Sequence, residues 1–448
     1  MSQLTEPERK SVAVIGLGYV GSCVAATLAD RGAVVVGIDT DGALVDALNQ
    51  SCCRFQEQEL EELLARAVGS GRLSCTTDYA AVAGVDVVLL IVGTPVRDDG
   101  SLDDRQLRAA CTTLAKHLRE GQLVVLKSTV PLGSTRSLVR PLLEESGLTA
   151  GEDFQLAFSP ERLAEGTALA ELRTLPVVAG GIDAASTKAA EGFWRQALGV
   201  EVLAMSTLEA AECVKLADNW WIDLNIALGN ELAKFCALFD VDVLEVIKAA
   251  NTVPKGTGSV NILLPSVGVG GSCLTKDPWM VWRSARDRDL DIRTAAVGRE
   301  VNARMPGYTA QLIFDELAKL GKKPESARIA VLGLAFKNNT GDLRATPTKG
   351  AVDALIEAGA AVRVHDPLAD DTSVKEMFGI RPSNSVAEAV RDADCVAILA
   401  HHRAFEAIDY GSLPVAKSCV VLDGRAYFPA EKIESLRALG FVYRGIGR

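Results

Sequence analysis

A glycine-rich turn between an apolar run and a helical pattern constrains the fold of this chain more than any other feature. The turn is Gly16-Leu17-Gly18-Tyr19-Val20-Gly21, which follows the apolar run Ser11–Ile15 and opens a helical pattern over Val20–Arg31. The first glycine permits a tight turn, the second allows a pyrophosphate to approach the backbone, and the third lets helix and strand pack closely. The spacing predicts the strand, turn and helix of a dinucleotide-binding domain. A tight turn that binds nothing is the alternative.

The residue at the end of the next apolar run bears on the identity of the dinucleotide. Ala33–Ile38 reads as a second strand, and Asp39 follows it directly. A carboxylate at this place accepts hydrogen bonds from a ribose diol and repels a 2′-phosphate, which favours NAD over NADP. We therefore expect NAD to be the cofactor.

Further apolar runs alternate with helical patterns along residues 1–205. The runs that read as strands are Val85–Val92, Leu123–Lys127, Phe154–Phe158, Pro176–Ala179 and Val200–Leu203. Strand, helix and strand at this spacing imply right-handed crossovers and a parallel sheet. We expect residues 1–205 to form an N-terminal NAD-binding Rossmann domain.

The pattern changes at about Ser206, where apolar residues begin to recur at the period of an α-helix. It extends to about Ala250 without proline, and Gly229 is its only weak point. It predicts a long central helix that links two domains. The broad apolar surface indicates a subunit interface, with burial inside one chain as the alternative. Asn251–Gly271 is rich in Gly, Pro, Ser and Asn and is expected to be a loop. We assign residues 206–305 to a central helical and dimerisation region.

An internal similarity indicates a second domain of the first kind. Residues 357–366 (EAGAAVRVHD) resemble 30–39 (DRGAVVVGID), and 328–335 (RIAVLGLA) resemble 11–18 (SVAVIGLG). The second copy keeps Gly333 but has Ala335 and Asn338 in place of two glycines, so it should not hold a dinucleotide in the same way. The expected architecture is α/β, with two Rossmann-like doubly wound parallel-sheet domains joined by a long central helix. The second domain spans residues 306–448.

Composition and charge argue against several classes of protein. Of the 448 residues, 48% are hydrophobic and 23% are charged, a globular balance rather than that of a disordered chain. The formal net charge of −11 argues against nucleic acid or an anionic membrane as a partner. The most apolar stretch, Val87–Val92, is too short to span a bilayer, and the polar first ten residues do not resemble a signal peptide. We therefore expect a cytoplasmic protein.

One cysteine has an unusual setting. The ten cysteines form no CxxC pair and the four histidines no zinc-binding pattern, so we expect no metal site and mostly reduced core thiols. Cys273, however, follows Gly270 and Gly271 and precedes Lys276 and Asp277. The glycines would let a ligand approach the sulfur, the lysine brings positive charge, and the aspartate could position water or a proton. A structural cysteine in a glycine-rich loop is the alternative.

Several further motifs occur in order along the chain. They are VGTP at 92–95, KSTVP at 127–131, SPER at 159–162, KLADN at 215–219, FKNNTGDLR at 336–344 and DGR at 423–425. With these motifs the chain resembles the nucleotide-sugar 6-dehydrogenases of the UDP-glucose/GDP-mannose dehydrogenase family over about residues 11–430. It is most similar to the UDP-glucose 6-dehydrogenase branch.

The resemblance implies a four-electron oxidation of a sugar C6 alcohol to a carboxylate with two NAD⁺ in turn. It implies that Lys215 and Asp277, with water near Thr129 and Asn219, handle the charge that develops in the first oxidation. Cys273 would trap the aldehyde as a thiohemiacetal that becomes a thioester. Hydrolysis of that thioester would involve Glu161 together with the same aspartate.

The resemblance also implies two sets of binding residues. For NAD these are the turn residues Gly16, Gly18, Tyr19, Val20 and Gly21 with Asp39, Thr94, Pro95, Ser128, Thr129, Glu165, Lys276 and Arg344. For a small nucleotide sugar they are Glu161, Arg162, Leu163, Lys215, Asn219, Gly268, Gly270, Phe336, Lys337 and Arg425. Each of these roles has a simpler alternative. Lys215 could be a solvated lysine, Glu161 and Glu165 could be acids in the first turn of a helix, and Arg344 could form a surface ion pair. A homodimer or higher homo-oligomer is expected.

Departures from the family bear on the substrate. Relatives carry an arginine before the cysteine loop, whereas residues 251–272 contain none, and Lys255 lacks the planar fork that would replace it. An arginine after the glutamate, as in Arg162, is similar to the branch that acts on N-acetylhexosamine nucleotides. That branch tends to have histidine before the cysteine, whereas this chain has Ser272, which is similar to the glucose branch. We give more weight to the feature beside the cysteine and expect UDP- or dTDP-glucose. A UDP-N-acetylhexosamine (mannosamine or glucosamine), a non-catalytic sensor and a two-electron dehydrogenase are the alternatives.

Overall fold

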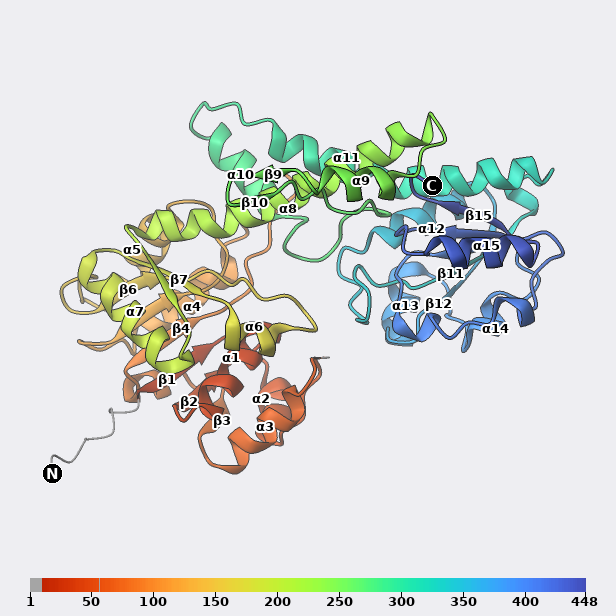
Figure 1. Ribbon diagram of the computed structural model, residues 1–448. Helices are drawn as coiled ribbons and strands as arrows, with labels where there is room; N and C mark the ends of the chain where they lie inside the picture. Colours follow the sequence, from red (N-terminus) through yellow and green to blue (C-terminus); the bar gives the residue numbers. More distant parts are fainter. Residues whose placement is uncertain (1–9, 56) are drawn as a thin grey trace, which may run out of the picture. The chain divides into compact units, whose positions relative to one another are not determined.

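The computed structural model describes residues 10–55 and 57–448. The chain divides into two compact units, which are described in turn (Figure 1). The first unit comprises the chain up to Asp218 with Arg283–Asp289, and the second comprises Asn219–Trp282 with Leu290–Arg448. The polar segment before residue 10, on which the expectation of no signal peptide rests, lies outside the described residues.

The first unit contains an eight-stranded sheet in the order β3-β2-β1-β4-β5-β6-β7-β8. The strands are β1 (Ser11–Ile15), β2 (Val34–Ile38), β3 (Leu73–Thr76), β4 (Val87–Leu90), β5 (Leu123–Leu126), β6 (Gln155–Phe158), β7 (Val177–Gly181) and β8 (Val202–Met205). The first six follow the order of a dinucleotide-binding Rossmann fold. Strand β3 was not predicted, because in this short strand apolar and polar residues alternate and there is no apolar run like those of its neighbours.

The pairing of β6 with β7 is antiparallel, whereas every other pair of neighbouring strands described in this sheet is parallel. The reason is the connection over residues 159–176, which carries only one short helix. The chain re-enters the sheet at the same end of the strands at which it left. The connection contains no crossover long enough to return the chain to the opposite end of the strands. This connection therefore stays at the carboxyl ends of β4, β5 and β6.

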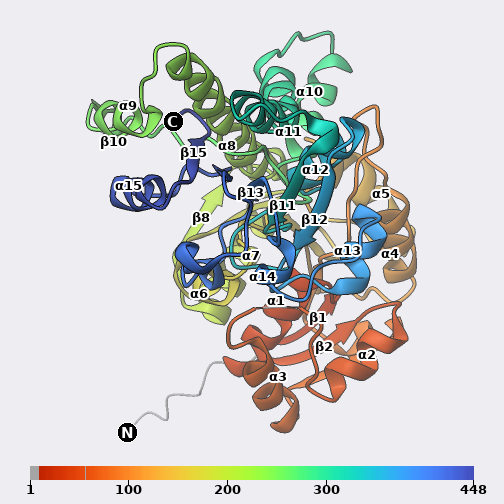
Figure 2. The same ribbon diagram turned by 90° about the vertical axis from the view of Figure 1, so that its right-hand side faces the viewer.

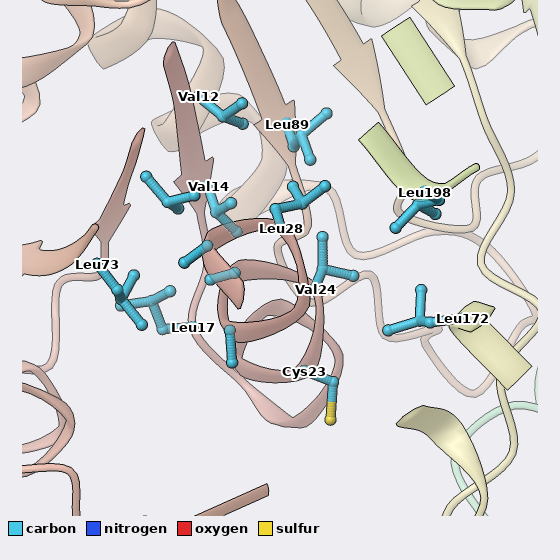
Figure 3. Close-up of a cluster of buried hydrophobic side chains, with 14 of the residues drawn as sticks. Val12, Val14, Leu17, Cys23, Val24, Leu28, Leu73, Leu89, Leu172 and Leu198 are labelled. Carbon is cyan, nitrogen blue, oxygen red and sulfur yellow. The ribbon is translucent and has the colours of Figure 1, made fainter. Parts of the chain in front are cut away.

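Helices cover both faces of this sheet. They are α1 (Tyr19–Asp30), α2 (Gly42–Asn49), α3 (Leu60–Gly69), α4 (Arg105–Ala115), α5 (Arg140–Glu144), α6 (Ala168–Thr174) and α7 (Ala184–Leu198), with a 3₁₀ segment at Tyr79–Gly84 and a π segment at Thr135–Val139. Strand β1 shows why two cores form: Val12 and Val14 enter the cluster that α1 completes, whereas Ala13 and Ile15 enter a second cluster. Figure 3 shows the first cluster, in which Leu28 of α1 lies near Val14.

The central helix is shorter than expected. Helix α8 runs from Leu208 to Ala237, and a separate helix α9 spans Val243–Ala250. The prediction of one helix to about Ala250 is wrong because Asp240 adopts a left-handed φ of +55° and Asp242 caps α9 by accepting from Leu244 N. The apolar residues before Asp240 continue the helical period and conceal the break.

The second unit contains the predicted second Rossmann-like sheet, with five parallel strands in the order β12-β11-β13-β14-β15. The strands are β11 (Arg328–Leu332), β12 (Ala361–His365), β13 (Cys395–Ile398), β14 (Val420–Asp423) and β15 (Val442–Gly445). Figures 1 and 2 show β11 and β12 side by side. The internal similarity is thus confirmed, because β1 and β11 are each paired with the second strand of their own copy.

The remaining elements surround this sheet or precede it. The helices are α10 (Asp277–Arg286), α11 (Thr294–Lys319), α12 (Pro347–Glu357), α13 (Asp371–Phe378), α14 (Val386–Ala389) and α15 (Ala430–Ala438), with 3₁₀ segments at Pro324–Ser326, Arg403–Phe405 and Tyr410–Ser412. The expected loop Asn251–Gly271 contains a small antiparallel pair, β9 (Pro254–Lys255) and β10 (Gly258–Ser259), and is otherwise irregular. Among the helices that the structure describes, none is both long and apolar enough to cross a membrane.

Candidate active site

The glycine-rich turn has the geometry that its sequence predicts. Gly16 has a φ of +93°, and a Cβ on it would lie 2.6 Å from Ile91 O. A Cβ on Gly21 would lie 1.8 Å from the carbonyl oxygen of Gly16, which confirms close packing of helix on strand. Gly18 differs, because no described heavy atom lies within 4 Å of the place of its Cβ. The open space at this glycine is where a pyrophosphate would approach the backbone.

The start of α1 and Asp39 fit NAD as well. Gly18 is the N-cap residue of α1, and no side chain in the described part of the chain caps it, so the first backbone N–H groups can meet phosphate oxygens. Asp39 follows β2 and is partly exposed; its Oδ2 accepts from Leu17 N at 2.7 Å and its Oδ1 from Asp41 N at 3.0 Å. An ionised carboxylate has further acceptor capacity for a ribose diol.

Tyr19 contributes its backbone to this turn, but its hydroxyl points elsewhere. The hydroxyl donates to Glu57 Oε2, which also accepts from Gly166 N at 2.7 Å. Burial, followed by the hydrogen bond to Glu57, raises the pKa of Tyr19. The start of α1 is thereby tied to the loop that carries Glu161 and Glu165.

The carboxyl ends of three strands bring together several predicted residues of the first unit. Thr94 and Pro95 follow β4, Ser128 and Thr129 follow β5, and Glu161 follows β6. The segments that follow β4 and β5 are joined by a hydrogen bond, in which the side chain of Ser128 donates from Oγ to Val92 O at 2.7 Å. Parallel strands place their carboxyl ends at one edge, which is where open α/β sheets bind ligands.

Lys127 opens the KSTVP motif, and its role was not predicted from the sequence. It directly follows the apolar strand β5 and is only 4% exposed. Its Nζ lies 3.4 Å from Glu161 Oε2, 3.5 Å from Pro160 O and 4.9 Å from the centre of the Trp194 ring. A lysine directly after a fully apolar strand is the signal that could have identified it. The ammonium is therefore the ion-pair partner of the Glu161 carboxylate.

Helix α8 carries Lys215 and, one turn later, Asn219. Both side chains are buried, at 7% and 6% exposure, so the alternative of a solvated lysine is wrong. Within the first unit, Arg162 Nε lies 3.1 Å from Asp218 Oδ2, and its Nη1 donates to Pro176 O at 3.4 Å. These contacts fix the arginine that follows Glu161.

In the second unit, an exposed thiol lies one helical turn from a buried carboxylate. Cys273 is exposed, and all ten cysteines are free thiols. Asp277 begins α10 and is fully buried, and its N–H donates to Cys273 O at 2.9 Å. Its Oδ1 accepts from Lys276 Nζ at 2.6 Å and its Oδ2 from Asn219 Nδ2 at 2.5 Å. The structure thus brings together three predicted residues that sequence separates by up to 58 positions.

The two glycines before this cysteine pack closely against Phe336. A Cβ on Gly270 would lie 2.5 Å from Phe336 Cβ, and a Cβ on Gly271 would lie 2.8 Å from Phe336 Cε2. Gly268, with a φ of +133°, similarly approaches Pro347. The glycines let the loop pack against Phe336, and that they also let a ligand approach the sulfur of Cys273 stays a prediction.

The predicted residues of the C-terminal domain are held by their neighbours. Arg425 donates from Nη2 to Phe336 O at 2.6 Å and from Nε to Leu399 O at 3.1 Å, and burial lowers its pKa. Arg344 forms a forked pair with Asp342, at 3.0 and 2.8 Å from Nε and 2.5 Å from Nη2. Lys337 lies on the same loop and is partly buried.

Three family models match consecutive parts of the chain. Residues 10–198 match the NAD binding domain of the UDP-glucose/GDP-mannose dehydrogenase family, residues 209–304 its central domain, and residues 330–430 its UDP binding domain. The chain belongs to this family. Its cofactor is NAD, and the geometry of the glycine-rich turn agrees with that assignment.

The individual relatives are named for different sugar substrates. The chain is 33% identical over 438 residues to the UDP-N-acetyl-D-mannosamine dehydrogenase of Pyrococcus horikoshii, covering 98% of this chain and 99% of the relative. The solved structure of that enzyme has a TM-score of 0.87, over 98% of this chain and 99% of the other. A UDP-glucose dehydrogenase structure from Pyrobaculum islandicum has a TM-score of 0.88 at 32% identity, covering 99% of each chain. An NDP-N-acetyl-D-galactosaminuronic acid dehydrogenase of Ralstonia solanacearum is 32% identical, over 97% of this chain and 100% of the relative.

Proposed function

We propose that this nucleotide-sugar dehydrogenase oxidises the C6 alcohol of a UDP-N-acetylhexosamine to the carboxylate in two successive NAD-dependent steps. The observation that carries the chemistry is the exposed Cys273 thiol one turn from the Asn219–Asp277–Lys276 cluster. For the sugar, Arg162 resembles the N-acetyl branch, and several full-length relatives bear N-acetylhexosamine names. This replaces the glucose expectation, which gave more weight to Ser272.

NAD supplies the hydride acceptor in each oxidation. In the first, Lys215 and Asp277 take and stabilise the charge of the C6 oxygen as its proton leaves. Lys276 and Asn219 donate to both oxygens of Asp277 and keep that carboxylate oriented. Thr129, after β5, is assigned to holding the water that relays the proton.

The aldehyde is retained as a covalent adduct. The Cys273 sulfur bonds to C6, and the aldehyde oxygen takes a proton, which gives a thiohemiacetal. In the second oxidation the C6 hydrogen leaves as hydride, the hydroxyl group gives up its proton to water, and a thioester remains. Water then attacks the acyl carbon, Glu161 accepts the water proton, and the C–S bond breaks to return the thiol. Lys127, whose Nζ lies 3.4 Å from Glu161 Oε2, holds this carboxylate in place.

UDP-glucose is the second candidate substrate. Ser272 stands where the N-acetyl branch tends to have histidine, and the relatives include a UDP-glucose 6-dehydrogenase of Haloferax volcanii at 33% identity over 422 residues. dTDP-glucose would test whether a 5-methyl group on the base is accepted.

One assay separates these possibilities. Purified protein is given NAD⁺ with UDP-N-acetylmannosamine, UDP-N-acetylglucosamine, UDP-N-acetylgalactosamine, UDP-glucose or dTDP-glucose, and NADH and acid product are counted. We expect two NADH per sugar, with kcat/KM highest for an N-acetylhexosamine. One NADH per sugar indicates a two-electron dehydrogenase, and tight binding without NADH indicates a sensor. A higher kcat/KM for UDP-glucose would favour the second candidate.

We also propose a homodimer or larger homo-oligomer. Trp221, Leu228 and Phe235 recur at intervals of seven along α8 and are 50%, 51% and 59% exposed. Side chains at this spacing form one stripe on a helix, and a second copy of the chain would cover it. A cytoplasmic location stays a prediction from the sequence.

A further inference from the structure

The two Rossmann-like domains use the acid after their second strand differently. In the first domain, Leu17 N donates to Asp39 Oδ2 at 2.7 Å. In the second, Leu334 N donates to Asp366 Oδ2, also at 2.7 Å. Asp366 therefore occupies the place of the ribose-binding acid. Asp39 is partly exposed, whereas the side chain of Asp366 is fully buried.

Asp366 is surrounded by protein donors. Its Oδ2 also accepts from Ala335 N at 3.2 Å and from His402 Nε2 at 3.0 Å, and its Oδ1 accepts from Leu368 N at 2.9 Å and Ala369 N at 3.1 Å. Burial by itself would raise the pKa of Asp366. The hydrogen bonds, led by the one from His402, lower it by more than burial raises it, so the pKa of Asp366 lies below its ordinary value. The carboxylate is ionised and occupied by protein groups, so it does not accept from a ligand.

His402 connects this acid to the loop over residues 336–342. Asn339 N donates to His402 Nδ1 at 2.8 Å, so Nδ1 carries no proton and Nε2–H is the donor to Asp366. Asn339 has a φ of +58°, a left-handed conformation that asparagine adopts more readily than most residues, especially when its side chain is hydrogen-bonded locally. Two neighbouring bonds run in the opposite direction: His401 N donates to Asn338 Oδ1 at 2.9 Å, and Arg403 N donates to Asn339 Oδ1 at 2.8 Å.

The loop that these bonds fix is the one expected to meet the nucleotide. It begins with Phe336 and Lys337, lies in the part of the chain that matches a UDP binding domain, and is also held by Arg425 through Phe336 O. We propose that His402 is a positioning residue for nucleotide binding, holding Asn339 and so the 336–342 loop in its binding conformation. The proposal rests on the proposed function, in which this loop holds the nucleotide of the substrate.

Two conservative variants separate the two bonds of His402. In H402N, the amide oxygen lies near the place of Nδ1 and can still accept from Asn339 N, while the donor to Asp366 is lost. In H402Q, the amide nitrogen lies near the place of Nε2 and can still donate to Asp366, while the acceptor for Asn339 is lost. Asp366 keeps four backbone donors in both variants.

The measured quantity is the Kd of UDP by calorimetry, with KM and kcat for the nucleotide sugar beside it. We expect H402Q to raise Kd and KM about fivefold to tenfold, as for a buried donor that loses its acceptor, with kcat and the KM of NAD⁺ unchanged. H402N should change them less than twofold. The matched control is H365Q, which removes another buried histidine, bonded to Ser383 O, and should leave UDP binding unchanged.

Equal weakening by both His402 variants, no weakening by H402Q, or equal weakening by H365Q would overturn the proposal. UDP binding does not require turnover, so a wild-type protein that binds UDP but oxidises no sugar contradicts the proposed function and leaves this test intact. If H402Q does not fold, ¹⁵N NMR of the unaltered protein decides. The Nε2–H tautomer of His402 with and without UDP supports the proposal, and the Nδ1–H tautomer contradicts it.

Discussion

At the scale of single residues, Cys273 has the exposure that a covalent catalyst needs, whereas six of the other cysteines are buried. Burial raises the pKa of the thiols of Cys111 and Cys419 to about 12, which makes them inert at neutral pH. The contrast supports Cys273 as the nucleophile.

Replacing Cys273 by alanine should abolish acid production, because the proposed thioester at C6 then lacks its sulfur. We expect a loss of about a thousandfold or more in the rate of the complete reaction, measured as carboxylate by mass spectrometry. The exposed Cys52 provides a matched control, and C52A should keep normal activity. Normal acid production by C273A would remove the thioester from the mechanism.

The pair of Lys127 and Glu161 makes a prediction about stability. K127M leaves the Glu161 carboxylate without its buried partner and should lower the free energy of unfolding by about 3 kcal/mol. The double variant K127M/E161Q should regain most of that loss, because no unpaired charge then remains. Urea unfolding of the four proteins of this cycle measures both changes. Equal losses in the single and double variants would show that packing against Trp194, rather than charge, explains the effect.

At the scale of elements, the glycine-rich turn offers a test that separates folding from cofactor binding. A Cβ on Gly21 would overlap Gly16 O at 1.8 Å, whereas a Cβ on Gly18 meets open space. G21A should therefore destabilise the first unit by roughly 3 kcal/mol through overpacking. G18A should keep its Tm within a degree or two but weaken NAD binding about tenfold or more, since its methyl group occupies the approach of the pyrophosphate.

Thermal unfolding and NAD titration of the two glycine variants measure these effects. Tight NAD binding by G18A would contradict the placement of the pyrophosphate at this turn. An unaltered Tm for G21A would contradict the close packing of α1 on β1.

Helices and strands were predictable to different degrees for physical reasons. Apolar runs such as Ser11–Ile15 became strands with the same bounds, because a buried parallel strand needs apolar residues on both faces. The end of α8 was not predictable from periodicity, because the apolar pattern continues past Ala237 while the backbone turns at Asp240. Local backbone conformation, not hydropathy, ends that helix.

At the scale of the whole molecule, the exposed stripe on α8 predicts how copies of the chain associate. F235D places a charge in the stripe and should shift the protein toward monomer at micromolar concentration, because an unpaired charge cannot be buried in an apolar interface. Sedimentation velocity measures the change. L439D, at an exposed leucine after α15, is the control and should leave the state unchanged. A wild-type monomer would contradict the prediction.

The sequence by itself determined the two Rossmann-like domains, the glycine-rich turn, the NAD cofactor and the family, because each depends on local spacing and on the order of motifs. Only the tertiary structure decided what surrounds those residues. It buried Lys127 beside Glu161, paired Asn219 and Lys276 with Asp277, packed Gly270 on Phe336 and enclosed Asp366 under His402. These contacts join residues far apart in the chain, and a one-dimensional pattern does not record which distant side chains the packing brings within hydrogen-bonding distance.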